Sequence, residues 1–312
     1  MSSSNEASET KIDFHLGFVS DIAAIGRLPE TLGYNIAYLG VAGGLATKAV
    51  ELSTIVANCW LLAVGFIAVM LSKVQASLAD VIHDRHLDRS NPSKSRIPAA
   101  LARVGIDSAA TFLVVSVIGA MMLWGWITKL TGDIRILSVG TLLCVFGFIY
   151  TYPPRIKERG ISNHLTTTAV DMACIWLFFM LVAGRGVSSM QQWGILVAVG
   201  LYAFGYHVAH QAADTYYDRQ HGISTFTQEI GATQSMWLAG LATTISTIVL
   251  AAFGAYLSAG VLAILSFGYA TIASWTHGER EQVKSYLISR WFSIGIWALI
   301  QNATLAMDLF LQ

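Results

Sequence analysis

Nine apolar runs, each about twenty residues long, occupy most of this chain. A helix of about twenty residues crosses the ~30 Å hydrocarbon core of a bilayer, and lipid forces the backbone to satisfy its own hydrogen bonds. The sequence therefore predicts an all-α, polytopic membrane protein with nine transmembrane helices. The first span is the weakest, because it is rich in glycine and contains Asn35. The predicted spans are about 32–50, 55–75, 107–128, 134–152, 166–184, 193–212, 234–256, 259–275 and 288–310.

Composition supports the membrane class and excludes others. The chain is 54% hydrophobic and only 12% charged, with a mean hydropathy of +0.57, whereas a soluble domain carries about a quarter charged residues. The formal net charge is zero, so no nucleic-acid partner is expected. The three cysteines lie in separate apolar runs without a CxxC motif, which favours simple packing over disulfides or metal binding.

The distribution of basic residues predicts the orientation in the membrane. Fifteen of the nineteen Lys and Arg residues, Lys73 among them, flank the spans on one side, and this side should be cytoplasmic by the positive-inside rule. Residues 1–14 are polar and lack the pattern of a cleavable signal. We therefore expect a cytoplasmic N-terminal segment over residues 1–31, followed by one membrane domain over residues 32–312.

Aspartates follow two of the apolar runs at four-residue spacing. Asp80, Asp84 and Asp88 follow the second run, and Asp214 and Asp218 follow the sixth. Both stretches contain the pattern D-x-x-x-D-R. Because four spans separate them, both helices should run in the same direction, with both aspartate sets at the cytoplasmic face. This arrangement suggests a parallel internal repeat of the kind found in membrane transport folds.

The spacing of the aspartates predicts metal chemistry. Residues four apart lie on one face of a helix, about 6 Å from each other along its axis, so each set forms a ladder of carboxylates. Mg²⁺ relieves the repulsion within such ladders and completes its shell with water and phosphate oxygens. Two facing ladders would hold a diphosphate through Mg²⁺. Alternatively, the aspartates could simply be solvated at the ends of membrane helices. That explanation would suffice for one ladder, but it is less favoured for two ladders on the same membrane face.

These motifs carry a resemblance to the UbiA superfamily of intramembrane prenyltransferases. That family has N-x-x-x-D-x-x-x-D after the second helix and D-x-x-x-D after the sixth. Here Asp84 and Asp88 match the first pair, and "NPSKSRIP" follows them. The segment "YTYPPRIKERG" at 150–160 resembles the family's Tyr/Pro-rich loop with its lysine. The chain departs from the family at Asp80, where the family usually has Asn, and at Ile97, which interrupts the usual Arg-Pro pair.

The resemblance implies nine helices around a central cavity and Mg²⁺-dependent loss of diphosphate from an isoprenyl diphosphate. The prenyl group would then pass to an aromatic or other lipophilic acceptor, with membrane lipids around the protein. The implied catalytic residues are Asp84, Asp88, Asp214, Asp218 and Lys157. The expected metal ligands are Asp80, Asp84, Asp88, Asp214 and Asp218.

Substrate contacts are expected from cations near the motifs, because the leaving group is anionic, and from nearby aromatic rings that could face an allylic cation. The alternative explanation for the cations is the excess of basic residues on the cytoplasmic side, and for the aromatic rings it is ordinary packing or a position at the membrane interface. Arg27 lies where the family often has a basic residue that meets the acceptor. The candidate substrate-binding residues are Arg85, Arg155, Lys157, Arg159, Arg219, Tyr152, Tyr217 and Asp171.

Asp171 stands apart because it lies inside the fifth predicted span, where a carboxylate is costly. It should face the protein interior, either to bind the acceptor, to steer the cation, or to bond a neighbouring helix. The histidines near the motifs lack the spacing of a zinc site. Two other functions remain open at this point. A terpene cyclase would share the metal site but capture the cation within its own chain, and a transporter is favoured only by helix count and repeat.

Overall fold

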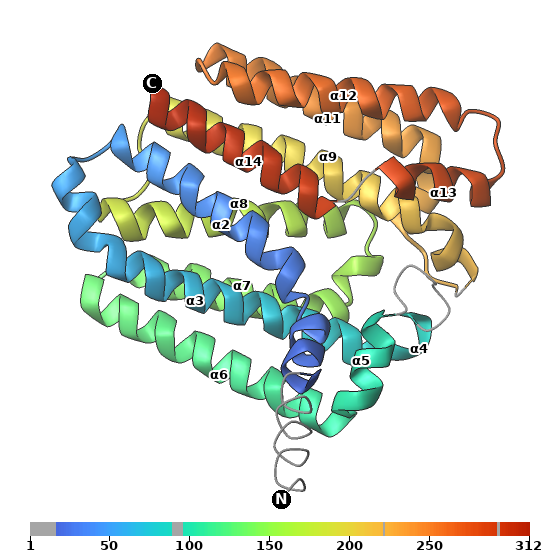
Figure 1. The fold of residues 1–312 in the computed structure, drawn as a ribbon, viewed down its shortest axis with the longest axis horizontal. Coiled ribbons are helices and arrows are strands. Elements are labelled where there is room, and N and C mark those ends of the chain that lie inside the picture. Colours follow the sequence, from blue (N-terminus) through green and yellow to red (C-terminus); the bar gives the residue numbers. More distant parts are fainter. Residues whose placement is uncertain (1–16, 89–95, 221, 292–293) are drawn as a thin grey trace, which may run out of the picture.

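The computed structural model describes residues 17–88, 96–220, 222–291 and 294–312, and every regular element in these ranges is helical (Figure 1). The predicted all-α class is confirmed. The elements are α2 (Leu28–Thr47), α3 (Leu52–His83), α4 (Arg85–Asp88), α5 (Arg96–Val104), α6 (Ile106–Thr131), α7 (Ile134–Thr151), the 3₁₀ turn η2 (Ile156–Glu158), α8 (Ile161–Ala183), α9 (Met190–Gln220), α10 (Phe226–Ile230), α11 (Ala232–Ala252), α12 (Tyr256–Trp275), α13 (Glu281–Trp291) and α14 (Ile294–Leu311).

Eight helical regions in the described part of the chain are long and apolar enough to cross a membrane, and α13 with α14 forms the last of them. The sequence predicted nine. The first predicted span corresponds to α2, a helix of 20 residues, whose glycines and polar side chains lower its hydropathy. The remaining predicted spans each lie within one of the eight regions, apart from residues at their ends.

The glycines of α2 have a packing role that explains this composition. A Cβ atom at Gly44 would lie 2.6 Å from the Leu309 Cβ of α14, and one at Gly40 would lie 3.0 Å from the Ala306 Cβ. The two helix backbones can approach this closely only because these positions lack side chains. The composition that weakens α2 as an apolar span therefore allows its close contact with α14.

Helices α3 and α9 are the elements that position the two motifs. They contain 32 and 31 residues, respectively, about ten more than a bilayer crossing needs. Their additional turns carry Asp80 and Asp214, and both C-terminal ends lie at the same end of the bundle (Figure 1). The predicted common face of the two motifs follows from this parallel arrangement.

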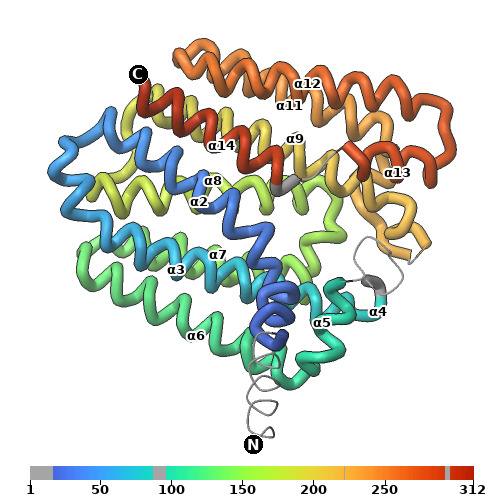
Figure 2. The backbone as a smooth tube through the Cα atoms, viewed as in Figure 1, coloured from blue at the N-terminus to red at the C-terminus, as the bar shows by residue number. Residues whose placement is uncertain are grey.

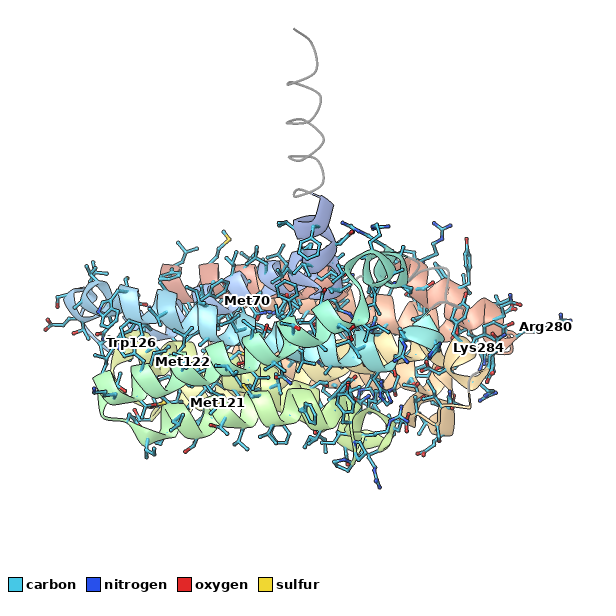
Figure 3. The ribbon with its side chains drawn as sticks, turned by 90° about the horizontal axis from the view of Figure 1, so that it is seen from below. Met70, Met121, Met122, Trp126, Arg280 and Lys284 are labelled. Carbon is cyan, nitrogen blue, oxygen red and sulfur yellow. The ribbon has the colours of Figure 1, made fainter. Side chains whose placement is uncertain are left out.

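Short helices gather at this motif end. Figure 2 shows α4, α5 and α13 there, beyond the long helices of the bundle. Arg280 and Lys284 also lie at this end, whereas Trp126 of α6 lies toward the opposite end (Figure 3). The long helices therefore run between a polar, basic end and an end with fewer charges.

The segment before α2 joins the fold as well. Residues 17–25 form a helix, in which Ala24 and Ile25 are buried against Leu78 and Val81 of α3 in a hydrophobic cluster that includes α5. The predicted boundary at residue 31 falls inside α2. This packing holds the N-terminal end of α2, and with it Arg27, beside the end of α3.

Candidate active site

The first aspartate motif lies where α3 ends and is surrounded by cations. Asp80 accepts hydrogen bonds from Arg27 at 3.1 Å, from Lys157 at 3.0 Å and from the Thr151 hydroxyl at 3.4 Å. Lys157 also donates to Asp84, which caps the C-terminus of α3. One ammonium group thus joins two carboxylates that lie one helical turn apart.

Lys157 is brought to this position by the loop after α7. The η2 turn follows Pro153 and Pro154, and the Lys157 side chain is only 11% exposed. Burial alone would lower the pKa of Lys157, but the carboxylates of Asp80 and Asp84 outweigh burial, and its pKa lies above the usual value. The side chain is therefore cationic at neutral pH and can meet an anionic substrate.

Two arginines at this site have an unusual backbone. Arg27 and Arg155 have φ angles of 49° and 55°, in the left-handed region that residues other than glycine seldom adopt. Arg27 reaches Asp80, whereas Arg155 pairs with Glu158 at 2.6 Å inside its own loop. Such conformations concentrate at functional sites, where the surrounding structure maintains them.

The second motif lies near the C-terminal end of α9, at the same end of the bundle as the first. Asp214 and Asp218 are partly buried. Tyr150, near the end of α7, lies within electrostatic range of Asp80, Asp84 and Asp218 together. The two motifs, 134 residues apart at Asp84 and Asp218, therefore converge around one tyrosine.

The donor chemistry of these motifs fits a hard divalent cation. In the described residues no three His, Cys, Asp or Glu side chains form a closed metal cage, and the Asp88 side chain lies outside the described part. The four described aspartates supply oxygen donors from two helices, with Lys157 between two of them. Mg²⁺ commonly takes one or two carboxylates and fills its other positions with water and phosphate oxygens, so an open site suits it.

A cavity of about 570 Å³ extends from the first motif into the bundle, between α2, α3, α7, α8 and α9. This volume falls within the range of small-molecule sites. Arg27 and Asp80 line the cavity, as do Tyr34 and Tyr150, and Lys73, Asp171 and His207 line it as well. The central cavity expected from the family resemblance is present.

Asp171 of α8 has three partners inside this cavity wall. Its Oδ1 accepts from Lys73 at 3.0 Å, and its Oδ2 accepts from His207 Nε2 at 2.9 Å and from the Tyr206 hydroxyl at 3.0 Å. The expectation that Asp171 faces the protein interior agrees with its exposure of 4%. The sequence analysis did not identify Lys73 or His207 as site residues.

Lys73 lies inside the bundle and not at a membrane flank. The prediction of orientation placed Lys73 among the residues that flank the second span, although it lies within the predicted limits of 55–75. In the structure Lys73 lies inside α3, and its side chain is only 13% exposed. A spacing signal was available, because Lys73 precedes Asp80 by seven residues, as His207 precedes Asp214. Seven residues are close to two helical turns, so each pair shares a helix face.

Several predicted substrate-binding residues have other partners in the structure. Arg85 donates to the Ile82 carbonyl at 2.9 Å, Arg159 donates to the Pro154 carbonyl at 2.9 Å, and Arg219 pairs with Glu281 at 2.5 Å. Tyr152 stacks on Phe148 with ring centres 4.7 Å apart. Tyr217 contacts Tyr216 edge to face. Their roles toward substrate remain predictions.

Comparison with known proteins places this architecture in a family. The model of the UbiA prenyltransferase family matches residues 37–294. A UbiA homologue from Archaeoglobus fulgidus, solved with GPP and Mg²⁺, is similar with a TM-score of 0.65 and 14% identity, over 94% of this chain and 100% of that one. A digeranylgeranylglyceryl phosphate synthase is similar with a TM-score of 0.63 and 14% identity, over 95% and 99% of the two chains.

A third solved structure, an apo UbiA homologue from Aeropyrum pernix K1, has a TM-score of 0.61 and 16% identity, over 90% of this chain and 98% of that one. The comparison with curated proteins found no match. At these identities the structures show a shared fold, and the family model covers most of the chain. The chain therefore belongs to the UbiA prenyltransferase family.

Proposed function

We propose that the protein is a Mg²⁺-dependent intramembrane prenyltransferase that ionises an isoprenyl diphosphate and transfers the prenyl group to a lipophilic acceptor. The observation that carries this proposal is the presence of two aspartate motifs and two partly buried cations at one end of the bundle, where Arg27 and Asp80 line a cavity. The A. fulgidus homologue bound to GPP and Mg²⁺ supports the same assignment of substrate and ion.

In this proposal the residues at the cavity mouth act on the leaving group. The aspartates of both motifs, Asp80, Asp84, Asp88, Asp214 and Asp218, would hold Mg²⁺, which neutralises negative charge on the diphosphate. Lys157 and Arg27 add positive charge directed at the same oxygens, so they stabilise the diphosphate as the C1–O bond breaks and its electron pair leaves.

The cavity below the mouth would protect the allylic cation. Helices α2, α3, α7, α8 and α9 border this space, and they would limit the access of water, which would otherwise capture the cation. Tyr34 and Tyr150 line this space, and aromatic faces attract positive charge. These features are shared by a prenyltransferase and by a terpene cyclase of the same fold. The family's transfer chemistry favours a separate acceptor.

A turnover experiment distinguishes the two reactions. Purified protein with Mg²⁺ and C10 to C20 prenyl diphosphates is expected to release little diphosphate until a lipophilic acceptor is added, because an uncaptured cation is unproductive. Diphosphate release and extractable products are measured together. Steady formation of a cyclic hydrocarbon or terpene alcohol from the diphosphate alone would show that the enzyme is a cyclase.

We also propose that the motif end of the bundle faces the cytoplasm, because most Lys and Arg residues flank this side. In a variant without Cys59, Cys144 and Cys174, cysteines introduced at Ser162 and Gln220 should react with a membrane-impermeant thiol reagent from the cytoplasmic side only. These two positions are exposed at the motif end. A cysteine at exposed Ser53, at the start of α3, should react from the opposite side, and the reverse pattern would contradict the orientation.

A further inference from the structure

A second polar layer lies in the cavity, deeper than the aspartate motifs. We call Lys73, Asp171, Tyr206 and His207 the inner cluster. Its members come from α3, α8 and α9, and three of them donate to the Asp171 carboxylate at 2.9 to 3.0 Å. Three of the four, all but Tyr206, line the cavity.

The inner cluster is presented by the same two helices as the aspartate motifs, about two helical turns farther from the motif end. Lys73 precedes Asp80 on α3 by seven residues, and His207 precedes Asp214 on α9 by the same number. Seven residues of helix correspond to about 10 Å along the axis. The two helices that present the aspartates at the mouth thus also present Lys73 and His207 to the two oxygens of Asp171, about two turns deeper.

This depth separates the inner cluster from the leaving group. The diphosphate belongs with the aspartates, Arg27 and Lys157 at the mouth, so its charge needs no partner two turns below. A cavity built only for a hydrocarbon chain would have apolar and aromatic walls there, because ionisable groups within a membrane are costly. The cluster therefore indicates a ligand that brings a polar group to the inner part of the cavity.

The hydrogen bonds also define which atom of His207 is available. The Lys73 ammonium and the Tyr206 hydroxyl both donate to Asp171, which favours its ionised form. Opposite a carboxylate, His207 Nε2, 2.9 Å from Oδ2, is assigned as the nitrogen that carries the proton. In the neutral ring the lone pair then resides on Nδ1. The His207 side chain is 22% exposed and lines the cavity, so this histidine combines a fixed orientation with access to a ligand.

We propose that the inner part of the cavity binds an acceptor that carries a hydroxyl group, and that His207 removes the hydroxyl proton. This inference rests on the proposed prenyl transfer. The C1–O bond of the prenyl diphosphate breaks, and its electron pair leaves with diphosphate. The acceptor oxygen forms an ether bond to C1, and its proton moves to His207 Nδ1. His207 is then the catalytic base, and Asp171 is a positioning residue that Lys73 keeps ionised.

The first test uses farnesyl diphosphate, Mg²⁺, and two alkyl-chain acceptors, 1-dodecanol and 4-hexylphenol, each with its methyl ether. Wild-type protein should form ethers from the hydroxyl compounds and nothing from the methyl ethers. His207→Gln should lower the kcat of transfer about 100-fold, which is typical for loss of a general base. His277→Gln, at an exposed position after α12, should match wild type.

Two further readouts separate a base from a merely structural residue. Binding of farnesyl S-thiolodiphosphate, an analogue that resists ionisation, should be unchanged within about two-fold in the His207 variants. Imidazole should restore part of the transfer activity of His207→Ala without stimulating wild type. Asp171→Asn should lower kcat while the KM for the acceptor stays unchanged.

The outcomes distinguish this inference from the proposed function. Wild-type turnover by His207→Gln, or parallel loss of transfer and analogue binding without an imidazole response, would overturn the role of His207. Transfer only to acceptors without a hydroxyl group, or attachment at a ring carbon, would overturn the acceptor class and leave the prenyltransferase intact. If wild type releases no diphosphate with any acceptor or without one, the proposed function itself fails.

Discussion

Replacing either Asp84 or Asp218 with Asn is expected to lower diphosphate release about 1,000-fold at saturating Mg²⁺, with the protein still folded in the membrane. Each substitution removes a negative charge from the proposed metal site, and transition-state stabilisation of the anionic leaving group depends on that ion. In addition, Asp84→Asn removes the negative charge that pairs with the Lys157 ammonium group. Release of radiolabelled diphosphate from the purified variants measures the effect.

Asp107→Asn provides the matched control. Asp107 is an exposed aspartate in the first turn of α6, at the motif end of the bundle, so the variant changes the same charge at the same end without touching the cavity. It should retain wild-type turnover. Unchanged diphosphate release in Asp84→Asn or Asp218→Asn would contradict the proposed role of the two motifs.

Replacing Lys73 with Met is expected to destabilise the folded protein by about 3 kcal/mol, because it leaves the buried Asp171 carboxylate without its cationic partner. The Lys73 and Asp171 side chains are only 13% and 6% exposed, so solvent screens the remaining charge weakly. Thermal unfolding in detergent micelles measures the loss. The double variant Lys73→Met with Asp171→Leu should recover most of it, since no uncompensated charge then remains.

The Arg135–Asp133 pair gives the comparison for this prediction. Its side chains are closer, at 2.6 Å, but Arg135 is 58% exposed. Arg135→Met should therefore cost less than about 1 kcal/mol, as exposed ion pairs do. Equal destabilisation by the Lys73 and Arg135 variants would mean that burial does not govern the Lys73–Asp171 interaction.

Features that depend on local pattern could be predicted from the sequence. The apolar runs predicted the helices, since hydropathy and length report directly on the surrounding lipid. The four-residue spacing of Asp80 and Asp84, and of Asp214 and Asp218, predicted shared helix faces. An even number of intervening spans predicted that both motifs lie at one end. The structure differs from these predictions at two helices. Contact with α14 favours glycine in α2, and α3 extends beyond the predicted end of its span.

Partners of individual charges could not be predicted in this way. Lys73 was placed among the basic residues at a membrane flank, whereas its partner in the structure is Asp171, 98 residues away. Arg85, Arg159 and Arg219 lie within or next to the motif segments in sequence, but they bond to nearby carbonyl groups or to Glu281. Sequence proximity to a motif therefore did not determine contact with it.

The sequence by itself determined the membrane class, the helical architecture and the two carboxylate ladders, because hydropathy and helical periodicity act over a few turns of one chain segment. Only the tertiary structure decided which cations meet Asp80 and Asp84, and that Lys73 and His207 meet at Asp171. A buried charge takes the partner that packing brings within about 3 Å, from whichever helix supplies it, and burial makes that choice energetically decisive.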